Sequence, residues 1–541
     1  MKLRAACLRR LPEETWDVLV VGGGINGAVS AACLSARGAR VALIDRGDFA
    51  GFTSQHSSNL AWGGIKYMET WEFGLVEQLC RSRNELMRAY PSTVREIRFF
   101  TAHPRRFRHA LWKLTLGTWA YWVLGRFFTR RPRRLSLAAM AAEEPIVRLD
   151  EADGGVEYSD AYLHDNDARF VWGFVRSALD HGAAAANYVE SLGATREGDL
   201  WNVRVRDVLT GDEFTVRARA LVNTCGPFVD GHNAMTSVRT RHRHVFSKGI
   251  HLIVPRVTEH RRVLTFFADD GRLFFVIPMG PRTCVGTTDT RVESPYTAVT
   301  DDDRRFVLDN INKRLKLDRP LTADDVIAER CGVRPLVVEQ SGDAKDDWLQ
   351  LSRKHAVEHD ATQRHVSVFG GKLTDCLNVG EEVFEAVRAL GVEAPFPTRR
   401  WYGESPEARE EFRHQAALMK LDALTSPRAS EPLSQRLWRR YGRDALAMLD
   451  SIRCDARNAE VLIEGAEYLR CEIEHAARRE MVTKLDDFLR RRSKIALVIA
   501  EDAVRAAPGL REACAMLFGD EADAKMAEYF ARHDAAPVTS T

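Results

Sequence analysis

The chain opens with a pattern of short apolar runs separated by glycines. Residues 16–21 form a run rich in β-branched side chains that is followed directly by glycine. Such a run predicts a buried strand of a parallel sheet. An Ala-rich segment that closes at Gly38 comes next, and a second apolar run, ARVALID, ends at Asp45. Together they predict a strand–helix–strand unit of about 30 residues.

The middle of the chain changes to alternating apolar and polar positions. Helical periodicity predicts helices over residues 71–90 and 168–181, and Gly182 is a suitable end to the second. The alternating segments lie at residues 200–208, 213–224, 251–255, 272–278 and 283–289. They predict an antiparallel or mixed sheet in this part of the chain.

A strand-to-helix pattern returns near the end of this region, at residues 366–390. Residues 393–410 contain several prolines and predict a linker. Residues 410–533 are dense in Ala, Leu, Arg and Glu with few β-branched residues, which predicts a helical domain.

Composition narrows the class of protein. The chain has 541 residues, of which 45% are apolar and 28% charged, with 36 Gly and 19 Pro, and this is ordinary for a globular protein. A net charge of +2 does not indicate a nucleic-acid partner. The ten cysteines include no C-x-x-C pair, so we expect no metal site, no disulfide framework and a reducing compartment. The N-terminus lacks an apolar core of signal-peptide length.

The balanced charge conceals one strongly basic stretch. Residues 97–142 contain no Asp or Glu and ten of the 78 Lys and Arg, which leaves 68 basic against 76 acidic groups elsewhere. Within it, residues 114–125 (LTLGTWAYWVLG) are uncharged. Twelve residues are too few to span a bilayer as a helix. Either an interfacial helix between cationic flanks or a buried helix with a solvated basic flank fits this pattern.

A glycine fingerprint follows the first predicted strand. Gly22, Gly24 and Gly27 form G-x-G-x-x-G between the strand and the helix. The first permits a tight turn, the second lets the backbone approach a pyrophosphate, and the third permits close helix packing. Asp45, at the end of the second strand, can accept hydrogen bonds from an adenosine ribose. The unit is therefore predicted to bind a dinucleotide.

The wider sequence resembles the FAD-dependent glycerol-3-phosphate dehydrogenases. The resemblance rests on ordered motifs: DVLVVGGGINGA, TSQHSSNLAWGGIKYMETWEF, VEYSDAYLHDNDARF, ALVNTCGPFVD, SKGIHLIVP, CVGTTDT, CGVRPL and SVFGGKLTD. They run from Asp17 to Leu390, and the C-terminal part, including YLRCEIEHAARRE, is similar more loosely.

This resemblance implies an α/β fold of the D-amino-acid-oxidase type. A Rossmann-type FAD-binding domain would be assembled from residues 1–100, 150–235 and 355–395, and residues 236–354 would form an inserted mixed or antiparallel sheet over the substrate. Residues 97–142 would be a membrane-surface segment and residues 396–541 a C-terminal helical domain.

Residues are carried over from the family motif by motif. The implied FAD-binding residues are Gly22, Gly24, Ile25, Asn26, Gly27, Asp45, Ser54, Ser57, Ser58, Thr224, Gly226, Gly371, Lys372, Leu373 and Thr374. The GGKLT segment would place backbone N–H groups at a helix start against the flavin, where the helix dipole stabilises negative charge. Cys225 lies beside Thr224, but no base that could activate its thiol is evident.

The implied substrate site combines a base with cations. His251 would accept the hydroxyl proton of the substrate, and Arg334 and Lys372 complete the implied catalytic set. The implied substrate-binding residues are Lys66, Tyr67, Arg334, Arg353 and Lys372. A guanidinium suits a phosphate dianion because it donates at two points.

This chain departs from the family next to the flavin. Where the family has HGGLRY, the sequence is WGGIKY, so Trp62 stands in the place of a histidine and Lys66 in that of an arginine. Asn59 replaces a lysine, and His56 occupies the position of a small residue. Lys66 keeps the charge without the two-point fork. His56 is either a covalent flavin attachment point or an ordinary packing residue.

The implied activity is oxidation of sn-glycerol 3-phosphate to dihydroxyacetone phosphate by hydride transfer to FAD, with electrons passed to a membrane quinone. The implied location is cytoplasmic, at the inner face of the cell membrane, on an anionic surface. Oxygen as acceptor, another small hydroxy compound as substrate, and a flavin-binding membrane-surface protein without turnover stay open as alternatives, and so does a homodimer. No nucleic-acid partner is expected.

Overall fold

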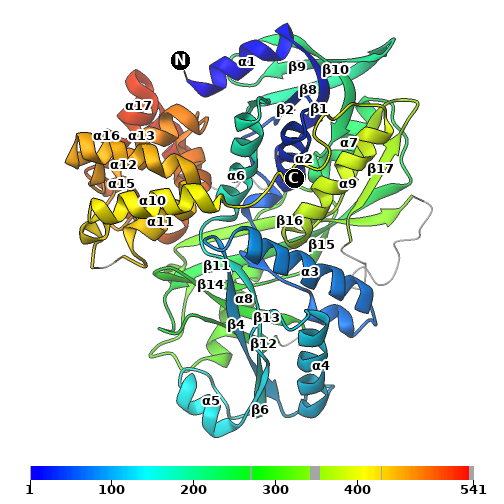
Figure 1. The fold of residues 1–541 in the computed structure, drawn as a ribbon. Coiled ribbons are helices and arrows are strands. Elements are labelled where there is room, and N and C mark those ends of the chain that lie inside the picture. The colour runs from blue at the N-terminus through cyan, green and yellow to red at the C-terminus, as the bar shows by residue number, and fades with distance from the viewer. Residues whose placement is uncertain (1, 269–270, 341–353, 428, 535–541) are drawn as a thin grey trace.

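The computed structural model describes residues 2–268, 271–340, 354–427 and 429–534. Two sheets form the larger part of the molecule, and a group of helices from the C-terminal end of the chain packs at one side (Figure 1). The N-terminal helix α1 (Leu3–Glu13), which the apolar pattern did not predict, packs against the first sheet.

The first sheet contains the predicted strand–helix–strand unit. Its strand order is β17-β18-β10-β1-β2-β7, with β8 and β9 forming an antiparallel extension of β10. The strands are β1 (Thr15–Val21), β2 (Val41–Ile44), β7 (Ala184–Ala186), β8 (Val189–Glu197), β9 (Leu200–Asp207), β10 (Glu213–Asn223), β17 (Ala356–Asp360) and β18 (His365–Phe369). β1 runs parallel to β2 and to β10, which in turn runs parallel to β18, so the apolar runs predicted as parallel strands lie side by side.

Helices cover the central strands of this sheet, such as β2 and β18, whose side chains are buried on both faces. Helix α2 (Ile25–Ala36) lies between α6 (Asp167–Asp180) and α9 (Cys376–Ala389) (Figure 1). The side chains of β2 and nearly all of those of α2 are buried in the same core. Two segments more than 300 residues apart in sequence, α2 and α9, therefore meet beside the glycine turn.

The second sheet is mixed and covers the C-terminal ends of the first sheet's strands. Its strand order is β15-β11-β14-β13-β12-β4-β6-β3, with β16 paired to β11 and β5 paired to β6. The strands are β3 (Leu60–Ala61), β4 (Val94–Pro104), β5 (Arg133–Leu135), β6 (Ala152–Leu163), β11 (His242–Pro255), β12 (Arg262–Phe267), β13 (Leu273–Met279), β14 (Arg282–Gly286), β15 (Thr290–Val292) and β16 (Ala328–Glu339).

The remaining helices flank these sheets or build the C-terminal part. They are α3 (Phe73–Ala89), α4 (Leu111–Leu124), α5 (Leu137–Glu143), α7 (Val229–Met235), α8 (Asp301–Arg314), α10 (Pro406–Leu418), α11 (Leu433–Tyr441), α12 (Ala445–Cys454), α13 (Arg470–Arg479), α14 (Ile495–Val498), α15 (Glu501–Ala506), α16 (Leu510–Phe518) and α17 (Ala522–Asp534). Short 3₁₀ turns at η1 (Thr53–Gln55), η2 (Ile65–Met68) and η6 (Leu373–Asp375) lie beside the glycine turn or the second sheet. A π-helical turn, η10 (Asp487–Arg492), lies in the C-terminal part.

The predicted fold class is confirmed, and two details differ from the sequence pattern. The alternating segments β9 and β10 join the first sheet, whereas the other alternating segments join the second. Strands β4 and β6, which fall in the segments assigned to the FAD domain, also lie in the second sheet. Local alternation shows that a segment is a half-buried strand but not which sheet it completes, because that choice is made by distant partners.

Buried ion pairs hold the C-terminal helices against the first sheet. Asp48, just after β2, accepts hydrogen bonds from Arg492 at 2.7 and 2.9 Å and from Arg491 at 2.6 Å. Arg169 on α6 pairs with Glu480 at 2.6 Å. All of these side chains are buried. Removing one member would leave a charge without its partner, so this interface depends on each of them.

Candidate active site

The glycine turn has the close contacts that its fingerprint predicts. Gly22 adopts a positive φ of 101°, and a Cβ there would lie 2.6 Å from the carbonyl oxygen of Thr224. A Cβ on Gly27 would overlap the carbonyl oxygen of Gly22. A larger residue at position 27 would push α2 away from the end of β1, and one at position 22 would displace the segment after β10, so these two positions need glycine.

The N-terminus of α2 points at the place where a pyrophosphate would lie. The first turn of α2 contains no acidic residue, and Ile25 donates its backbone N–H to Ser54 Oγ at 3.0 Å. Gly24 has open space except for that Oγ, which a Cβ would approach to 3.2 Å. The helix start therefore offers backbone donors and positive potential to an anion.

Asp45 lies at the end of β2 in the position suited to a ribose. Its carboxylate accepts hydrogen bonds from Gly23 N at 2.6 Å and from Gly47 N at 2.8 Å. Burial raises the pKa of Asp45 to about 6, although these two N–H groups lower it. A half-buried carboxylate next to the glycine turn is the group expected to bind ribose hydroxyls.

Two later segments close the same site. Thr224, directly after β10, donates its hydroxyl to the carbonyl oxygens of Val21 and Gly22 at 2.9 and 2.8 Å. Asn26 donates to the carbonyl oxygen of Gly370 at 2.9 Å. A Cβ on Gly371 would lie 3.0 Å from Asn26 Oδ1. Three segments far apart in sequence are thus joined around one helix start.

The remaining predicted cofactor residues lie around this start. Leu373 and Thr374 form η6 directly before α9, and Thr374 donates to the carbonyl oxygen of Trp62 at 3.3 Å. Gly226 has a positive φ of 57° at the turn after β10. Ser57 and Ser58 follow η1, and Ser57 donates its backbone N–H to Asp167 at 2.9 Å.

These observations fit a bound FAD. The turn leaves room where side chains would collide, the helix start presents N–H groups, and Asn26 Oδ1 is buried with no hydrogen-bond partner among the described residues. An unpartnered buried amide oxygen is costly unless a ligand donates to it. Cys225 is unsuited to covalent chemistry here, because burial raises the pKa of its thiol.

The predicted substrate residues come together on one face of β11 and β16. In the antiparallel register of these strands, Gly249 lies opposite Gly332 and His251 opposite Arg330. The guanidinium of Arg334 occupies the space that a Cβ on Gly249 would fill. Since His251 is two residues from Gly249, it projects from the same face. Arg334 and His251 therefore face one volume.

The guanidinium of Arg334 is held by hydrogen bonds, and its side chain is partly exposed. It donates to Thr287 Oγ1 at 3.1 Å and to Asp289 Oδ1 at 3.4 Å, and its side chain is 25% exposed. Both contacts lie on the segment after β14. A half-buried guanidinium oriented in this way can donate to a phosphate or a carboxylate without rearranging.

His251 is a buried imidazole without hydrogen bonds. Neither ring nitrogen has a partner among the described residues, and the residue is 3% exposed. Burial lowers the pKa of His251 to about 3, and the Arg334 and Arg330 charges lower it as well. The ring is therefore neutral near pH 7 and has a nitrogen available to accept a proton.

Lys372 and Tyr67 form a second contact at this site. The Lys372 ammonium donates to the Tyr67 hydroxyl at 2.9 Å and lies 4.1 Å from the centre of the Tyr67 ring. This contact joins the predicted flavin segment to the turn η2. Lys66 in the same turn has an exposed side chain, and Arg353 lies outside the described residues.

Two buried residues position this site: Arg330, which the family comparison did not single out, and Asn59, which stands in place of a family lysine. Arg330 donates to Asn59 Oδ1 at 2.6 Å and to the carbonyl oxygen of Ser57. Asn59 also donates to the carbonyl oxygen of Asp165 at 2.6 Å, so it ties the flavin segment to β16 and β6. The alternation Arg330, Gly332, Arg334 along a strand was the available signal, since alternate residues share a face.

His56 and Trp62, the other departures from the family, also lie beside this face. A Cβ on Gly332 would lie 2.9 Å from His56 Cβ, so that glycine makes room for the histidine segment. Burial lowers the pKa of His56, as do nearby positive charges and His251. The ring centroid of Trp62 lies 6.3 Å from that of Tyr67 and 6.4 Å from that of Phe275.

Comparison with known proteins follows the same division of the chain. The family described as "FAD dependent oxidoreductase" matches residues 17–360, and the one described as "C-terminal domain of alpha-glycerophosphate oxidase" matches residues 403–525.

Individual relatives extend this likeness to most of the chain. The chain is 30% identical to the aerobic glycerol-3-phosphate dehydrogenase of Escherichia coli (strain K12), across 89% of this chain and 94% of the relative. It is 31% identical to the D-erythritol 1-phosphate dehydrogenase of Brucella abortus (strain 2308), across 91% and 97%. The solved glycerol-3-phosphate dehydrogenase of Bacillus halodurans, complexed with FAD, shares the fold with a TM-score of 0.73, 24% identity and coverage of 98% and 97%.

Proposed function

The chain belongs to the family of FAD-dependent oxidoreductases, and from that membership we propose that it oxidises sn-glycerol 3-phosphate to dihydroxyacetone phosphate and passes the electrons to a membrane quinone. The observation that carries the proposal is the placement of Arg334 over Gly249 on the face that also presents His251. The guanidinium of Arg334 suits the phosphate of a small phosphorylated alcohol, and His251 suits the proton of its hydroxyl group.

Substrate binding rests on fixed cations. Arg334 donates to the phosphate, and Lys372, already in contact with Tyr67, contributes further donors for the phosphate or a hydroxyl. Because Thr287 and Asp289 already hold the side chain of Arg334 in place, substrate binding costs little side-chain conformational entropy.

His251 acts as the base that accepts the proton of the substrate hydroxyl. The bound FAD supplies the acceptor for the hydride that leaves the substrate carbon. A neutral His251 nitrogen takes the proton of the substrate hydroxyl as that carbon–hydrogen bond breaks. The phosphate dianion offsets the charge of Arg334, so substrate binding raises the pKa of His251 and makes it a stronger base.

A larger phosphorylated polyol is the second candidate substrate. Trp62 replaces the family's histidine and Lys66 its arginine, both in the segment that carries Tyr67. The relative named D-erythritol 1-phosphate dehydrogenase is as similar to this chain as the one named aerobic glycerol-3-phosphate dehydrogenase. A phosphate clamp at Arg334 serves either compound, since both are phosphate monoesters of polyols.

Anaerobic mixing of the FAD-loaded protein tests this assignment. With glycerol 3-phosphate the flavin absorbance should bleach, and it should reappear on addition of a short-chain quinone but slowly in air. Fast reoxidation by oxygen would favour an oxidase. A flavin that bleaches only with erythritol 1-phosphate would transfer the assignment to the larger substrate, and one that stays oxidised with both would indicate a flavin protein without turnover.

An exposed apolar helix supports a membrane-bound acceptor. On α4, Trp112 is 60% and Leu116 62% exposed, and Phe127 just beyond it is 59% exposed. Basic residues flank this helix on both sides. We infer peripheral binding at the anionic inner face of the membrane, where the apolar side chains enter the acyl boundary and the cations meet headgroups.

The same helix is connected to the candidate flavin segment. Tyr121 on α4 donates to Asp160 at 2.7 Å, and Asp160 accepts the backbone N–H of Gly63, next to Trp62, at 3.0 Å. Arg83 completes this buried group at 3.0 Å from Asp160. A quinone in the membrane would therefore lie near the segment that contacts the flavin. No helix in the described ranges has the length and apolar character needed to cross a bilayer.

A further inference from the structure

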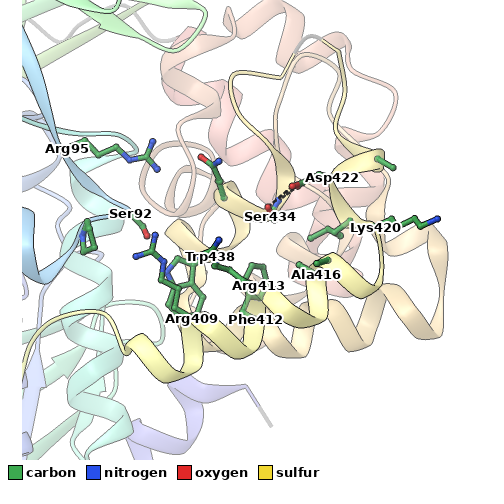
Figure 2. A pocket seen from close by; sticks show the side chains of 15 residues that line it. Ser92, Arg95, Arg409, Phe412, Arg413, Ala416, Lys420, Asp422, Ser434 and Trp438 are labelled. Atoms are coloured by element: carbon green, nitrogen blue, oxygen red, sulfur yellow. Dashed lines mark hydrogen bonds between the residues drawn. The ribbon is translucent and has the colours of Figure 1, made fainter.

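A cavity separate from the candidate active site lies between β4 and the C-terminal helices. It has a volume of about 830 Å³ and is lined from one side by the turn before β4 and from the other by α10 and α11 (Figure 2). Figure 2 shows Arg95 reaching in from the strand side, while Arg409, Phe412 and Arg413 come from α10. Its size suits a small organic ligand.

Positive charge dominates the lining. Arg95, Arg409, Arg413 and Lys420 line the cavity, against one carboxylate, that of Asp422. Within the described ranges, no ion pair joins Arg95, Arg413 or Lys420 to a carboxylate, and Arg409 reaches Glu404 only at 3.9 Å. Burial lowers the pKa of Arg95, partly offset by Glu404, while Arg409 and Arg261 lower it further. Cations crowded in this way repel one another and attract an anion.

The nearby carboxylates are already engaged by other groups. Asp422 accepts hydrogen bonds from the backbone N–H and hydroxyl of Ser434 at 2.8 and 2.9 Å, at the start of α11. Glu404 accepts hydrogen bonds from the backbone N–H and the hydroxyl of Ser92, both at 2.8 Å, and from Trp438 Nε1 at 2.9 Å. Both carboxylates thus act within the fold, and the arginines are left to face the cavity.

Apolar and aromatic side chains complete the lining. Phe412, Leu421 and Trp438 are all buried and line the cavity. Phe412 and Trp438 lie with ring centroids 5.7 Å apart. Phe412 and Leu421 lie beneath the surface of the cavity, so a ligand there meets the small accessible part of Trp438 beside the guanidinium groups, a combination that favours an organic anion over a bare inorganic ion.

From this geometry we infer a second binding site, for a small soluble organic phosphate, in the cavity formed by Arg95, Arg409, Arg413, Phe412 and Trp438. A phosphate dianion matches guanidinium groups that converge from two elements. Because Arg95 belongs to the second sheet and Arg413 to the C-terminal helices, a bound phosphate would join the two parts of the molecule. This site is independent of the proposed substrate site at Arg334.

Calorimetric titration of the FAD-loaded, full-length protein with phenyl phosphate tests the site, because this probe carries both a phosphate and an aromatic ring. The wild type should bind at two sites. R95Q/R413Q should weaken one site by about tenfold or more while turnover persists, and R334Q should weaken the other. The matched control R206Q/R388Q changes two exposed arginines elsewhere and should keep both sites.

Retention of both sites by R95Q/R413Q would overturn the inference, and so would a wild type with a single site that R334Q abolishes. If the double variant does not fold, K420Q, which changes an exposed lysine of the same lining, should still weaken the cavity site. Flotation with phosphatidylcholine vesicles containing phosphatidic acid distinguishes a lipid source: loss of vesicle binding in R95Q/R413Q without any loss of phenyl phosphate binding would also overturn the assignment to a soluble ligand.

Discussion

The guanidinium of Arg334 fills the space beside Gly249 that any other residue would occupy with its Cβ. The two residues belong to neighbouring antiparallel strands, β16 and β11. Arg334 can cross β11 toward His251 only because position 249 has no side chain. The proposed anion contact therefore depends on a glycine as much as on the arginine.

We predict that Gly249→Ala reproduces most of the effect of Arg334→Ala. Each change should lower kcat/KM for the phosphorylated substrate by roughly 30- to 700-fold, because about 2–4 kcal/mol of charge-assisted contact is lost. Steady-state kinetics of both single variants and of the double variant measure this. The double variant should be little worse than either single one, since both remove the same contact. Full additivity would mean that Gly249 acts separately from Arg334.

His251→Gln should slow flavin reduction by about 10²- to 10⁴-fold with little change in substrate affinity, because it removes the proton acceptor and leaves the cations in place. Stopped-flow reduction under anaerobic conditions measures both quantities. With the pKa of the free His251 near 3, its protonation should not depress the wild-type rate between about pH 6 and pH 8. An unchanged rate in the variant would assign the proton to another acceptor, such as water.

The sequence predicted the glycine turn and its strands because those signals are local. The run before Gly22, the closing Gly38 and Asp45 all lie within one strand–helix–strand unit. Contacts made by pairing of distant strands were not predictable in the same way. Arg330 lies opposite His251 only through the register of β16 with β11, about 80 residues apart, and Asn59 meets Arg330 across a still longer separation.

The basic stretch shows a different limit. Its composition left a buried helix and an interfacial helix equally open. Exposure of Trp112 and Leu116, with Tyr121 buried against Asp160, shows which side of α4 faces the protein. Without that neighbour, periodicity alone could not tell the buried face of α4 from its exposed face, because most residues of the helix are apolar.

We expect the folding stability of this protein to fall at alkaline pH because of His355, which lies next to the candidate flavin segment. It pairs with Asp375, directly after the GGKLT segment, at 3.2 Å and with Glu382 at 3.0 Å. Burial lowers the pKa of His355, but the two carboxylates raise it to about 9. Because the pKa of His355 is higher in the folded than in the unfolded state, its protonated imidazole stabilises the fold fully below the unfolded-state pKa of about 6.5. This stabilisation disappears as the pH rises through 9.

Thermal unfolding between about pH 6 and pH 10 should therefore show a loss on the order of 3 kcal/mol that His355→Asn abolishes. The matched control His359→Asn changes an exposed histidine of β17, the strand that begins directly after His355, and should keep the wild-type pH dependence. The same pH dependence in wild type and in His355→Asn would show that another group is responsible.

Asp48 should be required for docking of the C-terminal helices. Asp48→Asn leaves Arg491 and Arg492 buried without their shared carboxylate, which should cost about 3–5 kcal/mol. Burial raises the pKa of Asp48, but the two arginines outweigh it and lower the pKa below its usual value. Because the pKa of Asp48 is lower in the folded than in the unfolded state, its ionised carboxylate stabilises the fold above the unfolded-state pKa. This stabilisation is lost as the pH falls through the folded-state pKa. Denaturant unfolding at neutral and acidic pH measures both effects, and a variant that equals wild type at neutral pH would remove Asp48 from this role.

Membrane binding should combine an apolar and an electrostatic part. Trp112→Ser with Leu116→Ser removes exposed apolar area from α4 and should weaken vesicle binding at any ionic strength. Arg131→Gln with Arg134→Gln should weaken binding to anionic vesicles by roughly 30-fold, at about 1 kcal/mol per charge, and only at low salt.

These two arginines are the cleanest choice, because Arg130 pairs with Glu96 and Arg133 with Glu143 and Glu157, whereas in the described ranges neither Arg131 nor Arg134 forms an ion pair. Liposome flotation with and without anionic lipid measures the binding, and R206Q/R388Q serves as the control for charge lost elsewhere. Binding that ignores anionic lipid and survives both pairs of substitutions would contradict a membrane role for this surface and assign the membrane contact to another one.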